Sequence, residues 1–246
     1  NPYLSIDSSG KVSVRTPPVS DTQEKHITTL LEQVNYVPLL QILSDVNDIT
    51  NFTNCFEHYG IKHTKGKPSP ATFIAGIIAQ GCNIGVEKLA HTSKGVLENT
   101  LKNTVQWYFS HKNINSANNE VIAMIQKLSL PNVFINKEDE NHTSSDGRKV
   151  GVAVESLVAN YSFKYFGKDK GVSVYTFIDE KQSLFYSNVF SASEREAAYV
   201  IDGLINNDVI KSSIHSTDTH GYTETIFGAS HFLSTAYAPR IKNIKK

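Results

Sequence analysis

The sequence predicts an α+β protein in which a mostly helical N-terminal region precedes an α/β domain. Apolar residues recur at helical spacing from Ser20 to Leu130, and beyond about Asn141 this pattern gives way to short β-rich runs separated by helix-length segments. With 246 residues, 39% of them hydrophobic, the chain can bury one large core or two modest ones. We therefore divide it into residues 1–140, mostly helical, and residues 141–246, an α/β domain.

Alternating apolar residues predict a small hairpin at the start of the first region. Leu4 and Ile6 alternate with polar residues, Ser8-Ser9-Gly10 can turn, and the alternation returns at Val12 and Val14. The turn joins two short strands that need no contribution from the helices.

Helix boundaries in the first region are marked by capping residues. Ser20 with Gln23 forms a capping box, and Ser69 with Pro70 supplies an N-cap and a first helical residue, because proline's missing donor is not needed there. Gly60 predicts a helix end. Further helices are expected over residues 97–110 and over residues 116–128, where Pro131 ends the second.

The second region predicts strands and helices in an α/β order. The runs 172–178 and 184–190 are β-rich and are joined by a turn, which makes them antiparallel neighbours. Helical crossovers then make the later strands parallel. The expected later elements are a helix that follows Ser193 as its N-cap, has Glu194 and Glu196 in its first turn and runs to Ile205, a strand over 210–217, a helix over 222–233 and a strand over 236–241.

Composition excludes several classes of protein. Lys plus Arg (24) balance Asp plus Glu (24), so the chain is not a highly basic coat protein and any nucleic-acid binding must use local patches. The longest apolar run, Phe73 to Ala79, is too short to span a bilayer, so we expect no membrane partner. Cys55 and Cys82 are too few for a disulfide scaffold, which suits a cytoplasmic protein.

Two aspartates are the candidates for chemistry. Asp146 lies among small residues at the start of the β-rich half, and Asp218 lies where a predicted strand ends. Carboxylates at neighbouring strand ends can bind hard divalent cations, because Mg²⁺ takes oxygen ligands. Spacing alone leaves a second interpretation open, in which Asp146 is a turn residue and Asp218 a helix cap.

The histidines near the second aspartate do not predict a zinc site. His215 and His220 are five residues apart across a strand end, His231 lies further on, and no cysteine is close in sequence. We expect these imidazoles to make hydrogen bonds beside Asp218.

Joined motifs across the whole chain resemble the DDE transposases of the Tn3 family of replicative bacterial transposons. The longest resemblance lies around the second aspartate, and others lie upstream. They are His215-Ser-Thr-Asp-Thr-His-Gly-Tyr-Thr-Glu224, Ala238-Pro-Arg-Ile241, Thr143-Ser-Ser-Asp-Gly147, Tyr161-Ser-Phe-Lys-Tyr-Phe-Gly167, Gly171-Val-Ser-Val-Tyr-Thr176 and Ser193-Glu-Arg-Glu-Ala-Ala-Tyr-Val-Ile-Asp-Gly203. In the helical half the resemblance runs from Asn1-Pro2-Tyr3 to Trp107-Tyr108.

The resemblance implies an RNase H-like fold in which two Asp and one Glu hold two divalent ions, Mg²⁺ or Mn²⁺. Asp146 matches the first acid and Asp218 the second, and both are then catalytic and metal-binding. The family's third acid lies on a helix further downstream, so we expect an incomplete RNase H-like domain that is inactive alone. Glu224 belongs to the motif of the second aspartate and is not assigned that role.

For the intact protein the resemblance implies DNA cleavage at transposon ends and transfer of the freed 3′ hydroxyls to target DNA. The implied partners are the terminal inverted repeats, target DNA and a second copy of the chain, at the bacterial nucleoid. Basic and polar groups are candidates for holding the phosphate backbone. They are Arg240, Lys242, Lys245 and Lys246 near the end of the chain, Lys164, Lys168 and Lys170 as a second patch, and His220.

Two other hypotheses stay open at the level of sequence. The chain could be a truncated DNA-binding or dimerising module without catalysis. Alternatively, it could be a metal-dependent nuclease that uses a local acid, Glu155 or Glu224, together with the Asp pair. A downstream reading frame with a helix-borne Glu would favour the transposase over the truncated module.

Overall fold

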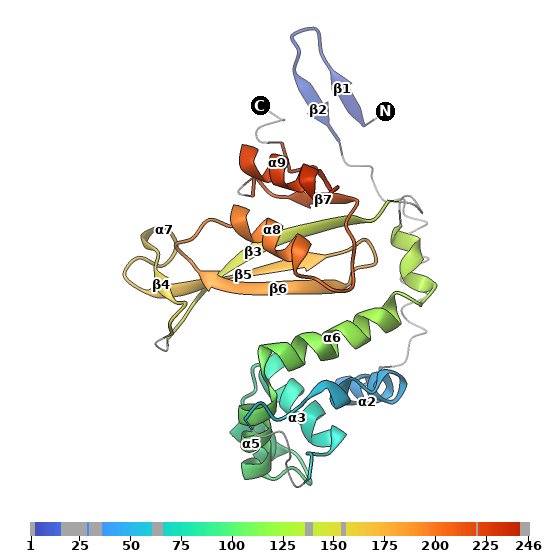
Figure 1. Cartoon of the computed structure of the whole chain (residues 1–246), viewed down its shortest axis with the longest axis vertical. Helices are drawn as coiled ribbons and strands as arrows, with labels where there is room; N and C mark the ends of the chain where they lie inside the picture. The colour runs from blue at the N-terminus through green and yellow to red at the C-terminus, as the bar shows by residue number, and fades with distance from the viewer. Residues whose placement is uncertain are drawn as a thin grey trace.

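A computed structural model describes residues 3–15, 29, 36–60, 66–135, 140–153, 156–219 and 221–241. A mixed β-sheet lies in the middle of the molecule, with two helices against one side and a cluster of helices at the far end (Figure 1). The expected capping box at Ser20 and Gln23 lies outside the described residues. In the part of the chain that is described, no helix is long and apolar enough to cross a membrane.

The helical region is built around a small aromatic core. Phe52, Phe56 and Phe73 are buried there with Tyr108, and the rings of Phe56 and Phe73 stack at 5.1 Å. The elements that supply this core are α2 (Leu39–Thr50), η1 (Phe52–Cys55), α3 (Pro70–Gly81), α4 (Val86–Thr92), α5 (Glu98–Tyr108), α6 (His111–Ile125) and η2 (Leu130–Phe134).

The capping chemistry of this region follows the sequence in part. The side chain of Ser69 accepts a hydrogen bond from the Thr72 N–H, which confirms the predicted start of α3. Ser110 caps α6, so the helix expected to begin at residue 116 begins five residues earlier. Gly60 does not end a helix, because the chain leaves η1 at Cys55 and continues as a loop.

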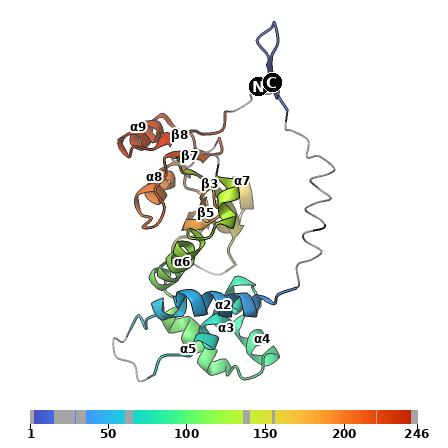
Figure 2. The ribbon, with the colours of Figure 1, turned by 90° about the vertical axis from the view of Figure 1, so that its right-hand side faces the viewer.

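The N-terminal hairpin is confirmed. Strand β1 (Leu4–Ile6) pairs antiparallel with β2 (Val12–Val14), and the carboxylate of Asp7 accepts hydrogen bonds from the backbone N–H groups of Ser9 and Lys11 within the turn. In both views the hairpin stands apart from the main sheet (Figures 1 and 2).

The α/β half contains one six-stranded sheet. Its strands run in the order β4-β5-β3-β7-β8. Strand β6 also pairs with β5, along Val172–Ile178, directly after the two residues of β5 that pair with β4. Strand β3 is antiparallel to β5 and parallel to β7, and β7 is parallel to β8. The elements are β3 (His142–Gly151), β4 (Asn160–Tyr161), α7 (Phe163–Phe166), β5 (Lys170–Ile178), β6 (Leu184–Ser191), α8 (Ala197–Ile205), β7 (Ile214–Thr217), α9 (Glu224–Phe232) and β8 (Ala236–Tyr237).

Helices α8 and α9 cover one face of the sheet, and the main core lies beneath them (Figure 1). Tyr175 and Phe177 of β5 and Val200 of α8 are almost fully buried in this core. Gly203 brings α8 close to the sheet, because a Cβ there would lie 2.1 Å from the ring of Phe177. The residues that alternate with the core positions face the other way and are more exposed.

Helix α6 connects the helical region to the sheet. Asn118 donates to the Leu184 carbonyl at the start of β6, Gln126 donates to Asp179, and Ile122 lies in the core of the sheet. Figure 2 shows α6 lying between the sheet and helices α2, α3 and α5. The described structure therefore joins the two halves through a packed helix.

Several predicted bounds in the second half need correction. Helix α8 begins at Ala197 after Glu196, not after Ser193, whose hydroxyl instead hydrogen bonds to that of Ser191. Strand β7 begins four residues later than expected, at Ile214, because the preceding residues form the turn that follows α8. Strand β8 covers only Ala236–Tyr237 instead of the expected residues 236–241. Backbone N–H groups nevertheless continue to donate to β7 as far as Arg240.

Candidate functional site

The register of two central strands brings the two candidate aspartates together. Strand β3 pairs with β7 in parallel, and the last pair is Ser145 with Thr217. Asp146 directly follows Ser145 and Asp218 directly follows Thr217. The two aspartates therefore lie at the same level on neighbouring strands, whose backbones are about 4.8 Å apart in a sheet. Residues that alternate along a strand point to opposite faces, and both aspartates fall on the face that α8 and α9 leave open.

The alternative interpretation of these aspartates is wrong. Asp146 is not a turn residue, because it lies inside a ten-residue strand and pairs with Thr176 of β5. Asp218 is not the cap of α9, because the Thr223 side chain accepts the capping hydrogen bond from the Ile226 N–H. Neither local role therefore explains these two aspartates.

The two aspartates line one open hollow of about 470 Å³, here named the carboxylate hollow. Asp146 is exposed and Asp218 is half-buried, and one oxygen of Asp218 accepts a hydrogen bond of 3.2 Å from the Gly221 N–H. Arg240 reaches the same hollow, since its backbone N–H bonds to the Thr217 carbonyl. Its lining includes Ser144, Asp146, Thr176, Ser216, Asp218 and Arg240.

A buried hydrogen-bond network lies directly behind the aspartates, on the covered face. His215 of β7 contacts two hydroxyls of β3, Thr143 through Nδ1 and Ser145 through Nε2, each at 2.8 Å. The Ser145 hydroxyl also donates to the Tyr175 oxygen at 2.9 Å. Because His215, three residues before Asp218, bridges β7 to Thr143 and Ser145 just before Asp146, the network fixes the level at which the carboxylates meet.

Burial sets the ionisation of this network. Desolvation, with a smaller effect from His142, lowers the pKa of His215 from 6.5 to about 4. Desolvation likewise raises the pKa of Tyr175 far above its ordinary value. Both groups are consequently neutral at physiological pH, and the network holds the strands through neutral hydrogen bonds.

A half-buried ion pair lies beside the first aspartate on the covered side. Gly147 has no side chain, and a Cβ there would lie 2.6 Å from the Glu196 carboxyl carbon. The Glu196 oxygen is 3.6 Å from the Lys149 ammonium group, which also donates to the Ser173 hydroxyl. Glu196 therefore faces away from the carboxylate hollow and forms an ion pair with Lys149.

The candidate DNA-binding residues are not all in one place. Arg240 lines the carboxylate hollow. Lys164 of α7 lies over the Tyr165 ring at 4.9 Å and lines a different hollow with Lys149 and Thr219. Lys242 and His220, like Lys245 and Lys246, lie outside the described residues.

No third acid lines the carboxylate hollow among the described residues. Glu224 is the first residue of α9, exposed and without a place in the hollow, as expected for a first-turn glutamate stabilised by the helix dipole. Glu155 lies outside the described residues. The described chain also shows no group of three His, Cys, Asp or Glu residues that could hold a metal.

The donor set of the hollow is suited to a hard cation. The two carboxylates are accompanied by the hydroxyl-bearing residues Ser144 and Ser216, and every one of these donors is an oxygen. No Cys or His lines the hollow in the described chain, so a thiolate or imidazole site for zinc is not formed there. The residues therefore fit Mg²⁺ or Mn²⁺ in type.

Sequence reasoning missed strand β3 and the network behind it. The run Thr143 to Gly147 is polar and small and predicts a turn, yet it forms the middle of the sheet. The available signal was the alternation of Thr143 and Ser145 with Ser144 and Asp146, which places two hydroxyls on one face and the carboxylate on the other.

The chain is similar to known transposases. The model of a family described as the Tn3 transposase DDE domain matches residues 41–246. The transposase for transposon Tn1546 of Enterococcus faecium is 30% identical over 227 residues, which cover 92% of this chain and 23% of the relative. The transposase for transposon Tn2501 of Escherichia coli is 30% identical over 208 residues, which cover 84% of this chain and 20% of the relative.

The chain thus spans about a quarter or less of the curated relatives it matches. Among solved structures, a Mos1 transposase paired-end complex with the left transposon end covers 89% of this chain and 73% of its own, with a TM-score of 0.28 and 11% identity. That likeness is too weak to support any argument about the site.

Proposed function

The chain belongs to the Tn3 transposase family, and we propose that it forms the part of a transposase that positions a DNA phosphate for strand cleavage and strand transfer at Asp146 and Asp218. Its fold is the expected α+β one, a helical region followed by an RNase H-like sheet domain. We also propose that residues 1–140 and residues 141–246 form two separate units.

One observation carries the proposal. Asp146 and Asp218, which are 72 residues apart in sequence (218 − 146), follow the last parallel pair of β3 and β7 and line one open hollow. Two carboxylates held this close repel each other, and a divalent cation between them removes the repulsion. The open face also leaves space for a polymer, because neither α8 nor α9 covers it.

Asp146 and Asp218 would hold the divalent ions, Mg²⁺ or Mn²⁺, that the family implies. Such a pair of ions supplies Lewis-acid stabilisation of the attacking and leaving oxygens of a phosphoryl transfer. The protein's contribution is to orient the oxygen donors, and the buried contacts of His215 with Thr143 and Ser145 keep the strands that carry them in register.

Arg240 is proposed to orient the phosphate. Its backbone is held to β7 by the bond to Thr217, and its side chain lines the hollow beside the aspartates. A guanidinium group can form two parallel hydrogen bonds with a phosphate, so it fixes the direction of the phosphate as well as neutralising it. Lys164 and the basic residues beyond Ile241 are proposed to contact the backbone further from the site.

A complete site needs one more acidic ligand than the described hollow contains. Two carboxylates leave a pair of divalent ions poorly neutralised, so we expect weak metal binding and no strand transfer by residues 1–246 alone. We propose that a glutamate of the intact transposase completes the site, as in the family. DNA at transposon ends, target DNA and a second copy of the transposase are the proposed partners.

The test is strand transfer by the intact transposase carrying Asp146→Asn or Asp218→Asn. Each change removes one charge and keeps the shape of the side chain, so the rate should fall by at least about a hundredfold. Affinity for transposon-end DNA should stay within about threefold, because specific DNA affinity comes mainly from many phosphate and base contacts elsewhere.

Asp48→Asn is the matched control, since Asp48 is exposed on α2 and far from the hollow in sequence and fold. It should leave strand transfer unchanged. Strand transfer at the normal rate in either hollow variant would overturn the proposed function.

A further inference from the structure

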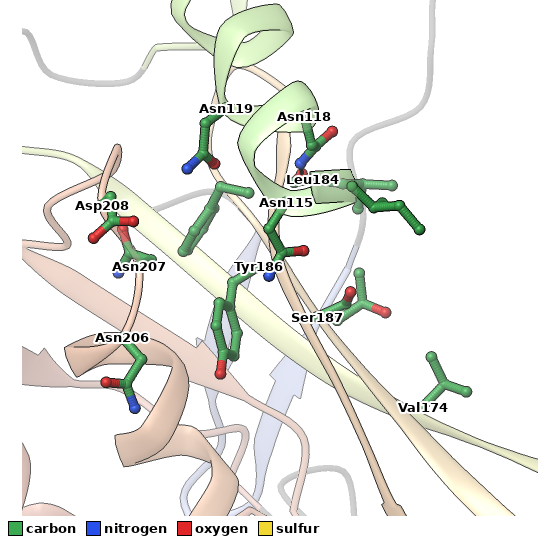
Figure 3. A pocket seen from close by; sticks show the side chains of 13 residues that line it. Asn115, Asn118, Asn119, Val174, Leu184, Tyr186, Ser187, Asn206, Asn207 and Asp208 are labelled. Atoms are coloured by element: carbon green, nitrogen blue, oxygen red, sulfur yellow. Dashed lines mark hydrogen bonds between the residues drawn. The ribbon is translucent and has the colours of Figure 1, made fainter. Parts of the chain in front are cut away.

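A second hollow lies between α6 and the outer side of β6, with a volume of about 380 Å³ (Figure 3). It is lined by several side-chain amides together with the aromatic residues Phe185 and Tyr186, and we name it the amide groove. The residues that define it are Asn115, Asn118 and Asn119 of α6, Tyr186 of β6, and Asn206 and Asn207 after α8.

The amide groove adjoins the carboxylate hollow. Thr176 and Leu184 line both. Thr176 is also the residue of β5 that pairs with Asp146. Tyr186 pairs with Phe177, whose side chain lies in the covered core, so a chain of nucleotides whose phosphate lies at the aspartates would reach the amide groove around β6.

Two of the amides have no protein partner in the described structure. Asn118 donates to the Leu184 carbonyl and Asn207 donates to the Gly203 carbonyl, so these two have structural bonds. Asn115 and Asn119 are half-buried, and no hydrogen bond joins either side chain to another described residue. Each amide can donate and accept at once, which matches the mixed donors and acceptors on a base edge.

The ring of Tyr186 in the groove is held by two contacts. The Tyr186 hydroxyl donates to Asp202 at 2.8 Å, and its ring packs edge-on against Phe177 with centroids 5.5 Å apart. Figure 3 shows Tyr186 below the amides that project from α6. A fixed ring beside free amides provides both a surface for stacking and groups for hydrogen bonding.

The charge of the groove argues against phosphate as its ligand. No Lys or Arg is among its described lining residues, and the one ionisable acid there, Asp208, would repel a phosphate. Neutral amides with an aromatic ring instead suit a flat, uncharged heterocycle.

We propose that the amide groove binds an unpaired nucleobase next to the phosphate that is cut or joined. This rests on the proposed function, because it assumes that DNA lies across the carboxylate hollow. The base stacks on Tyr186, and its edge hydrogen bonds to Asn115 and Asn119. Adenine is favoured among the bases, because an amide can make two hydrogen bonds to its N6 and N7 groups.

The experiment measures DNA binding by this chain with fluorescence anisotropy. One labelled duplex carries a single unpaired adenine, and a second duplex is identical except for an abasic position. The first should bind roughly tenfold more tightly, which is the effect expected of one stacked and hydrogen-bonded base. Combined Asn115→Ala and Asn119→Ala substitutions should remove the difference between the two duplexes.

The matched control combines Asn99→Ala with Asn103→Ala, two exposed asparagines of α5 that lie outside the groove. This control should keep the tenfold preference, and thermal melting should show that both double variants are folded. Equal affinity of the unsubstituted chain for the two duplexes would overturn the inference, as would an equal loss of preference in the control.

Asp146→Asn separates this inference from the proposed function. The substituted chain should still prefer the unpaired adenine, because the groove does not use that carboxylate. If the preference is absent while the aspartate variants still abolish strand transfer, the inference fails and the proposed function stands. If the preference is present while those variants remain active, the proposed function fails instead.

Discussion

The two faces of β3 and β7 differ in how their polar groups are used. On the covered face, His215 is fully buried and bonds to Thr143 and Ser145, and Thr217 bonds to the Tyr237 hydroxyl at 2.7 Å. On the open face, Asp146 is exposed, and among the described residues its carboxylate accepts a hydrogen bond from the Gly147 N–H alone. Residues adjacent in sequence thus have opposite tasks.

The covered face thus stabilises the geometry, and the open face presents carboxylates that a ligand can reach. A buried polar group left without a partner destabilises the fold, so a network with every member paired tolerates little change. An exposed carboxylate can be changed with little effect on stability. Substitutions on the two faces should therefore separate folding from function, and the predictions below run from the largest expected effect on stability to the smallest.

His215→Ala should have the largest effect. The change empties a buried volume and leaves the hydroxyls of Thr143 and Ser145 without their imidazole partner, so the free energy of unfolding should fall by about 3 kcal/mol. Urea unfolding followed by circular dichroism measures this. The control His231→Ala removes an exposed imidazole and should change stability by less than about 0.5 kcal/mol.

The buried imidazole also predicts a dependence of stability on pH. Because the pKa of His215 is about 4 in the folded chain and 6.5 when unperturbed, the unfolded state binds more protons between these values. Its contribution to stability is therefore present above pH 6.5 and is lost as pH falls toward 4, with a slope approaching 1.4 kcal/mol per pH unit.

Urea unfolding at a series of pH values tests that slope against His215→Gln, which cannot titrate in this range. The substituted chain should show a shallower fall of stability between pH 6.5 and 4. The same slope in both proteins would mean that other groups cause the acid sensitivity.

Gly203→Ala should have a smaller but clear effect on the covered side. The added methyl group would meet the ring of Phe177, so α8 must move away from the sheet, at a cost of about 2 kcal/mol in unfolding free energy. Gly228→Ala in α9 is the matched control, because a Cβ there has no neighbour within 4 Å. That control should be neutral or stabilising by up to about 1 kcal/mol through helix propensity, and equal losses in the two variants would contradict close packing at Gly203.

Asp146→Asn should have the smallest effect on stability. The carboxylate is exposed and accepts only the Gly147 N–H, so unfolding free energy should change by less than about 0.5 kcal/mol. A loss as large as that of His215→Ala would show that the open face also holds the fold together.

Much of the fold could be predicted where the period of apolar residues was clear. The strands at 172–178 and 184–190, the helix that ends at Ile205 and the N-terminal hairpin are confirmed, although the helix begins later than predicted, because alternation or helical spacing is visible in each. Tyr108 and its neighbours Trp107 and Phe109 pack in the helical core. Strand β3 lacks such an apolar period, because its buried residues are polar and bond to side chains of other strands.

The candidate site divides in the same way. Asp146, Asp218 and Arg240 were selected from motifs and lie in one hollow, although their roles remain proposals. The amides of Asn115 and Asn119 carried no signal, because polar residues on a helix are usually solvated. Only their position opposite Tyr186 distinguishes them.

The sequence by itself determined the α+β order, the family and the identity of the two aspartates, since these depend on local periodicity and on motifs of consecutive residues. The tertiary structure alone decided that Ser145 pairs with Thr217, that the aspartates share the uncovered face, and that the amide groove joins their hollow through Thr176 and Leu184. These features depend on register between strands far apart in the chain. Register is fixed by side-chain burial on both partners, which no single segment of sequence contains.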